Sequence, residues 1–150
     1  MMQRIGTWPN GANVTQLRVA RPTDRLEAVV RFYRDGVGLA EIGGFGGPDH
    51  MGYDGVMLGL PGAEVHLEFT QHEHGSPGPA PTQDNLLVFY IPDADEADAI
   101  CDRLIAQGHH PVEPDNPYWA VHGTTFADPD GWRIVIQRTR GITSLVIPRS

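Results

Sequence analysis

The same order of predicted secondary structure occurs in both halves of this 150-residue chain. In each half a short apolar strand is followed by an amphipathic helix and then by three more strands. A proline-rich segment without periodicity, residues 75–84, separates the halves. Neither half can bury its own sheet alone, so the repeat predicts two units that pack side by side.

The predicted organisation follows from apolar alternation and from the turn residues between the strands. The expected strands are residues 16–22, 39–45, 55–60 and 64–72 in the first half, and 85–91, 110–113, 118–127 and 132–138 in the second, with 144–147 as an additional strand at the end of the chain. The chain is therefore divided into an N-terminal tail (1–15), a first module (16–74), a proline-rich connector (75–84), a second module (85–140) and a C-terminal tail (141–150).

Each module contains one predicted helix. In the first module Asp24 is expected to cap the helix, with Glu27 three positions on as in a capping box. In the second module the cap is expected at Asp93 or Asp95. The apolar faces consist of residues 26, 29, 30, 33 and 37 in the first helix and 97, 100, 101, 104 and 105 in the second.

The strand at residues 64–72 has the sharpest pattern in the sequence. Its apolar side chains, Val65, Leu67 and Phe69, alternate with polar ones that include His66 and Glu68. The apolar side chains are expected to face the core, so the polar ones share the opposite face. Polar groups on a covered sheet face need partners, which makes this face a candidate binding site.

Composition excludes several classes of function. Eleven basic against nineteen acidic residues give a formal net charge of −8, which argues against nucleic-acid partners and anionic membrane surfaces. Every basic residue is arginine, and the absence of lysine excludes Schiff-base chemistry and a P-loop. The single cysteine, Cys101, excludes an internal disulfide. No apolar run is long enough for a membrane span, and residues 1–15 lack the apolar core of a signal peptide, so a cytoplasmic location is expected.

The doubled unit and its motifs resemble the vicinal oxygen chelate superfamily, which includes glyoxalase I, extradiol dioxygenases and bleomycin resistance proteins. The resemblance covers about residues 16–138. Within the superfamily, the chain looks like an uncharacterised bacterial subgroup. It rests on Phe32-Tyr33 with Gly36-Val37-Gly38-Leu39, on Glu68 within His-Leu-Glu-Phe, on Asp128-Pro129-Asp130-Gly131-Trp132, and on the segments 85–93 and 116–119. It implies an α+β fold in which two tandem βαβββ modules form a sheet-lined cup with the helices outside. It also implies a homodimer, because bare sheet edges need a cover.

In the enzymes of that superfamily a divalent metal lies at the base of the cup. One side chain from the first and one from the last strand of each module hold it. Glu68 matches one of these positions, whereas the other three offer Arg18 or Val19, Leu86 and Val135, which are not typical metal ligands. The family pattern therefore implies a member without the usual metal site, and no cofactor is expected.

Two functions remain open at this stage. The first is a metal-independent small-molecule binding protein. Its expected pocket consists of Arg18, His66, Glu68, Leu86, Val88, Tyr90, Trp119, Arg133 and Val135. The second is a lyase or dioxygenase whose metal (zinc, nickel, iron or manganese) has moved to His66, Glu68 and His122.

The roles of the charged pocket residues also remain open. Glu68 is a candidate general base in the cup, or else it forms an ion pair with Arg18 or Arg133. Both arginines lie on strands that are expected to line the cup. A guanidinium in a half-buried pocket recognises a carboxylate or a phosphate of a ligand.

Overall fold

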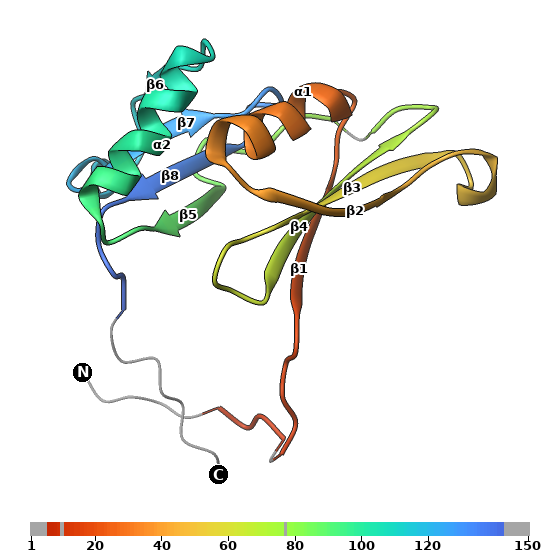
Figure 1. The fold of residues 1–150 in the computed structure, drawn as a ribbon, viewed down its shortest axis with the longest axis horizontal. Coiled ribbons are helices and arrows are strands. Elements are labelled where there is room, and N and C mark those ends of the chain that lie inside the picture. Colours follow the sequence, from red (N-terminus) through yellow and green to blue (C-terminus); the bar gives the residue numbers. More distant parts are fainter. Residues whose placement is uncertain (1–5, 10, 77, 143–150) are drawn as a thin grey trace.

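The structure is a computed structural model that describes residues 6–9, 11–76 and 78–142. Its elements form two similar modules that lie beside each other (Figure 1). The first module contains β1 (Leu17–Pro22), α1 (Leu26–Val30), the π-helix η1 (Arg31–Val37), β2 (Ala40–Phe45), the 3₁₀ helix η2 (Pro48–His50), β3 (Tyr53–Gly59) and β4 (Val65–His72). The second contains β5 (Leu86–Tyr90), α2 (Ala94–Ala106), β6 (Pro111–Val112), the 3₁₀ helix η3 (Pro117–Ala120), β7 (Gly123–Ala127) and β8 (Arg133–Gln137).

The two sheets have the same topology. Their strand orders are β1-β4-β3-β2 and β5-β8-β7-β6. In each sheet the first strand runs parallel to the last strand of its module, and the remaining pairs are antiparallel. This arrangement confirms the predicted α+β fold of two tandem βαβββ modules.

One hydrophobic core joins the modules. The helices lie on the same side of both sheets (Figure 1), and side chains from both sheets pack against them. The core contains Leu58, Leu67 and Phe69 of the first sheet, Phe126, Ile134 and Ile136 of the second, and Val29, Phe32, Tyr33, Ala97 and Leu104 from the helical segments. Because side chains alternate along a strand, the residues between these positions lie on the opposite face of each sheet. We call that opposite face the cup face.

The start of the first helix differs from the prediction. The α-helix begins at Leu26, and its N-cap, Arg25, makes no side-chain capping bond. The Asp24 carboxylate instead accepts a hydrogen bond from the Ser76 backbone N–H at 2.8 Å. The predicted capping box with Glu27 is therefore wrong, because a long-range contact with the connector uses the carboxylate. At the second helix, Asp93 caps the first turn as predicted, accepting from the N–H groups of Asp95 and Glu96.

The predicted strand 118–127 is also only partly correct. Residues 117–120 form η3, and β7 begins at Gly123. Asn116 accepts a hydrogen bond from the Tyr118 N–H, and Pro117 occupies the first position of the turn, a combination that favours a helical start. The additional strand suggested at 144–147 lies outside the described residues. Within the described part of the chain, none of the helices is both long enough and apolar enough to cross a membrane.

Candidate functional site

The first sheet presents a charged cluster on its cup face. The parallel register of β1 and β4 places Arg18 opposite His66, with Glu68 two residues further along β4. The Arg18 Nη1 donates to Glu68 Oε2 at 2.6 Å, and its Nε donates to His66 Nε2 at 2.7 Å. In this contact the guanidinium is the donor, and His66 accepts through Nε2. One guanidinium therefore holds both the imidazole and the carboxylate.

Burial differs among the three side chains. His66 is buried, and the side chain of Glu68 is 13% exposed, whereas that of Arg18 is 46% exposed. The Arg18–Glu68 ion pair is one of the two roles that the sequence left open for Glu68. Arg18 uses two of its five N–H donors on these partners, so three donors remain free on a side chain that is half exposed.

The second sheet presents a mostly apolar cup face. Leu86, Val88 and Tyr90 on β5 lie beside Arg133, Val135 and Gln137 on β8 in the parallel register. Val135 is fully buried, and Tyr90 is exposed. Trp119, also predicted in the pocket, lies in η3, and its carbonyl oxygen covers Gly123 so closely that no larger side chain fits there.

The three side chains proposed as alternative metal ligands, His66, Glu68 and His122, do not form one metal-binding group among the described residues of the chain. His66 and Glu68 lie on β4 of the first sheet, whereas His122 precedes β7 of the second. His122 is exposed, and its carbonyl oxygen accepts a hydrogen bond from the Arg138 N–H. Among the described residues no group of three or more His, Cys, Asp or Glu side chains is arranged to hold a metal ion.

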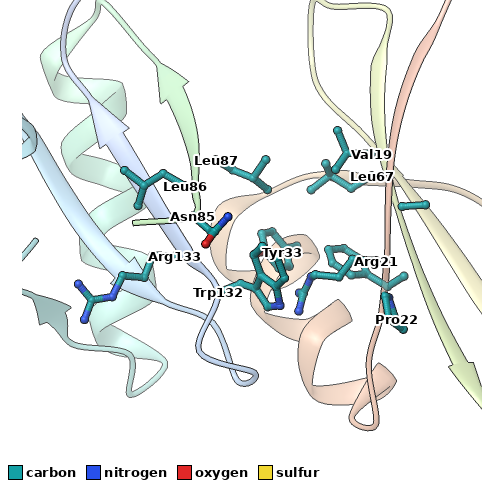
Figure 2. Close-up of a pocket in the computed structure, with 12 residues that line it drawn as sticks. Val19, Arg21, Pro22, Tyr33, Leu67, Asn85, Leu86, Leu87, Trp132 and Arg133 are labelled. Atoms are coloured by element: carbon teal, nitrogen blue, oxygen red, sulfur yellow. The ribbon is translucent and has the colours of Figure 1, made fainter. Parts of the chain in front are cut away.

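A cavity of about 330 Å³ lies where the two modules meet (Figure 2). One side of the cavity is lined by Asn85, Leu86, Leu87 and Arg133. The other side is lined by Val19, Leu67, Arg21 and Pro22. Tyr33 and Trp132 lie between the two groups in Figure 2. Leu86 and Arg133 were predicted as pocket residues, but most of the lining was not. It was missed because its members come from strands and turns of both modules, and no local pattern connects them.

A buried polar network lies beside this cavity. Asp128 Oδ2 accepts from the Tyr33 hydroxyl and from Arg21 Nη2, each at 2.7 Å, and the second guanidinium nitrogen donates to Asp130 at 3.1 Å. The Arg21 guanidinium also lies 5.0 Å from the ring centre of Phe69 and 5.2 Å from that of Trp132. The network therefore joins β1 and η1 of the first module to the turn before β8 of the second.

The turn itself is fixed by Asp128. Its Oδ1 accepts from the N–H groups of Asp130 and Trp132, and Gly131 takes the left-handed conformation with φ of +83°. Burial raises the pKa of Asp128, and the charge of Arg21 opposes that rise. Burial, followed by the adjacent Asp128 carboxylate, raises the pKa of Tyr33 well above its ordinary value of 10.0.

The raised pKa of Tyr33 predicts loss of stability in alkali. The unfolded chain releases the tyrosine proton near pH 10, whereas folded Tyr33 keeps it, so this contribution is fully present below pH 10.0 and is lost as pH rises further. The free energy of unfolding should fall by about 1.4 kcal/mol per pH unit in that range. Tyr33→Phe should remove this slope in urea unfolding at several pH values, and the exposed Tyr118→Phe should keep it. Parallel curves for wild type and Tyr33→Phe would contradict the assignment.

Two βαβββ modules with helices on one side of their sheets define a protein of the vicinal oxygen chelate superfamily. A glyoxalase I from Leishmania major has this fold, with a TM-score of 0.63 and 17% identity over 83% of this chain and 85% of that one. TnmS3, an antibiotic binding protein from a Streptomyces species, has a TM-score of 0.59 and 25% identity over 83% of this chain and 94% of its own.

The particular family follows from the sequence. Residues 17–70 match the YycE-like N-terminal domain, and residues 84–138 match the YycE-like C-terminal domain. The uncharacterized protein YycE of Bacillus subtilis (strain 168) is 53% identical over 128 residues, covering 85% of this chain and 91% of that protein. A crystal structure of B. subtilis YycE, described as a protein of unknown function and a candidate glyoxalase or fosfomycin resistance protein, has a TM-score of 0.80 and 52% identity over 87% of this chain and 93% of that one. The chain belongs to the YycE-like family.

Proposed function

We propose that this chain is a small-molecule binding protein of the glyoxalase and bleomycin-resistance type, and that it works without the superfamily's usual metal. The observation that carries the proposal is the bonding of Arg18 to both Glu68 and His66. A guanidinium cation occupies the lone pairs that a metal would need. The donor set does not fit a metal at the family positions, because the other three offer Arg18 or Val19, Leu86 and Val135.

The rest of the cup supports ligand binding. Leu86, Val88 and Tyr90 supply accessible apolar side chains, whereas Val135 is fully buried, and the free N–H donors of Arg18 supply a polar group for orientation. Sites for small molecules combine these two features. Comparison with the antibiotic binding protein TnmS3 agrees with this proposal, since that relative shares the fold at 25% identity.

We extend the proposal to a homodimer. In the described part of the chain, β1 and β5 are each one of the two outer strands of their sheets. Three large apolar side chains on them, Leu17, Val19 and Tyr90, are more than 40% exposed. Such edges invite pairing with another chain, and a second copy would cover them.

Metal content is the measurement that separates the two candidate functions. We expect untagged protein, grown in metal-replete medium without chelators, to contain far less than one transition metal per chain. The metal content should stay low after incubation with nickel, zinc, iron and manganese, as read by elemental mass spectrometry.

Native mass spectrometry of the same sample should give two chains per particle.

About one metal per chain would overturn the proposal and favour a lyase or dioxygenase with a metal at His66, Glu68 and His122. In that case His66→Ala and His122→Ala would each lose the metal, and Arg31→Met, on the outer surface of the first helical segment, would keep it. A metal-free protein that no compound of a drug-like library stabilises, but that turns over an oxoaldehyde or a catechol, would also overturn the binding proposal.

A further inference from the structure

Arg133 differs from the other cup arginine in its partners. It lies on β8 and is 9% exposed, and its Nη1 donates to the Glu113 carbonyl oxygen at 3.0 Å. No carboxylate of the described residues forms an ion pair with it, whereas Arg18 is paired with Glu68. A buried charge is costly unless it is paired. The Arg133 guanidinium thus keeps N–H donors that bond no described residue, and these donors are not buried, because the Thr125 hydroxyl is the one buried side-chain polar atom without a partner among the described residues.

Thr125 provides a second, independent observation on the same cup face. It is 3% exposed, and its hydroxyl is a buried polar group without a hydrogen-bond partner among the described residues. β7 pairs with β8 so that Thr125 is opposite Val135 and Arg133 is opposite Ala127, two residues away. Diagonal neighbours of this kind lie about 7–8 Å apart, within reach of a long side chain.

We infer that Arg133 and Thr125 form a site for the oxyanion of a small ligand, either a carboxylate or a phosphate. The free N–H groups of Arg133 and the Thr125 hydroxyl can both donate hydrogen bonds, and a guanidinium matches the planar fork of an oxyanion. The chain has a formal net charge of −8, which repels anions from the molecule as a whole. An anion bound here must therefore be held by these two groups. The inference rests on the proposed function and deepens it by naming the ligand class.

The cavity at the module junction borders this site only at Arg133, since Thr125 is not among its lining residues. Arg133 lines the cavity together with Leu86 and Asn85, but in Figure 2 its guanidinium points away from Tyr33, Trp132 and Arg21. The remaining lining of the cavity is mainly apolar and includes Leu87 and Val19. On the cup face the register partner of Arg133 on β5 is the apolar Leu86, so we expect a ligand with an apolar body and one acidic head.

Matched acidic and neutral probes test the inference. We expect benzoate or phenyl phosphate to bind the full-length protein in isothermal titration calorimetry, and benzamide to bind much more weakly. Arg133→Met should raise the Kd of the acid by about 10- to 100-fold. Thr125→Val should raise it less. Arg31→Met removes the same charge from a solvated position paired with Glu27 and should leave the Kd unchanged.

The ligand-free stabilities distinguish a binding role from a structural one. If the role of Arg133 is to bind an anion, ligand-free Arg133→Met should melt close to the wild-type temperature, because in the absence of ligand it loses one side-chain hydrogen bond, to the Glu113 carbonyl oxygen, and no ion pair. Should that variant fail to fold, Thr125→Val still tests the site, since it removes an unpartnered hydroxyl at nearly constant volume.

Three results would overturn the inference. The first is equal affinity for benzoate and benzamide, which would leave the proposed binding function intact but without an anion site. The second is unchanged binding of the acids by Arg133→Met. The third is no binding of either acid at millimolar concentration, while library compounds without an acidic group stabilise the protein.

Discussion

Asp128→Ala is expected to lower the free energy of unfolding by about 3–5 kcal/mol, because it leaves the buried Arg21 with Asp130 as its one carboxylate partner and removes the acceptor of several further donors. The Asp128 side chain is fully buried, and that of Arg21, its ion-pair partner, is 11% exposed. The carboxylate also accepts from the Tyr33 hydroxyl and from two backbone N–H groups of its own turn. The substitution therefore affects both the turn and the junction between the modules.

Urea unfolding of a small set of variants checks this prediction. Asp128→Asn keeps an acceptor for the turn but loses the charge, so it should be less harmful than Asp128→Ala. Arg21→Met combined with Asp128→Ala should cost less than the sum of the single changes, because neither partner is then left unpaired. Asp98→Ala breaks an ion pair with Arg138 in which the Asp98 side chain is 56% exposed, and it should cost below about 1 kcal/mol. A similar small loss for Asp128→Ala would contradict the assigned role.

The parts of the fold that the sequence predicted depend on local pattern. Alternation along residues 64–72 separates Leu67 and Phe69 from His66 and Glu68, and the structure places the first pair in the core. Asp93 caps its helix because the acceptor and the donors are only two or three residues apart. The motif at residues 128–132 forms the expected turn for the same reason. In each case the partners lie in one short segment.

The parts that the sequence did not predict depend on contacts between distant segments. Asp24 has the residue type and position of a helix cap, yet its carboxylate accepts a hydrogen bond from a backbone N–H 52 positions away. Arg21 meets Asp128 across 107 positions, and no periodicity connects the two residues. The pairing of Glu68 with Arg18 stayed one of two open roles, because it depends on the parallel register of β1 and β4, which the local sequence does not determine. Register and packing between modules are long-range properties.

The second large effect is expected where α2 packs against η1 of the other module. Leu104 is fully buried, and a Cβ at Gly36 would lie 2.6 Å from one of its methyl groups. Arg103 strengthens this contact by donating to the carbonyl oxygens of Gly36 and Val37 at 2.7 and 2.8 Å. Leu104→Ala should cost about 2–5 kcal/mol through the cavity that it leaves. Gly36→Ala should cost about 1–3 kcal/mol through overpacking.

The double variant tests whether these two residues share one space. Leu104→Ala removes the methyl group that an alanine at position 36 would meet, so the new methyl can enter part of the vacated volume. The combined loss in urea unfolding should therefore be smaller than the sum of the single losses, by about 0.5–3 kcal/mol. Gly62→Ala is a poor control because its backbone is left-handed, whereas Ala106→Gly at the exposed end of α2 changes helix propensity alone. Strict additivity of Gly36→Ala and Leu104→Ala would mean that the module junction relaxes around each change separately. In that case the contact between η1 and α2 is not rigid, and it does not fix the two cup faces in their relative positions.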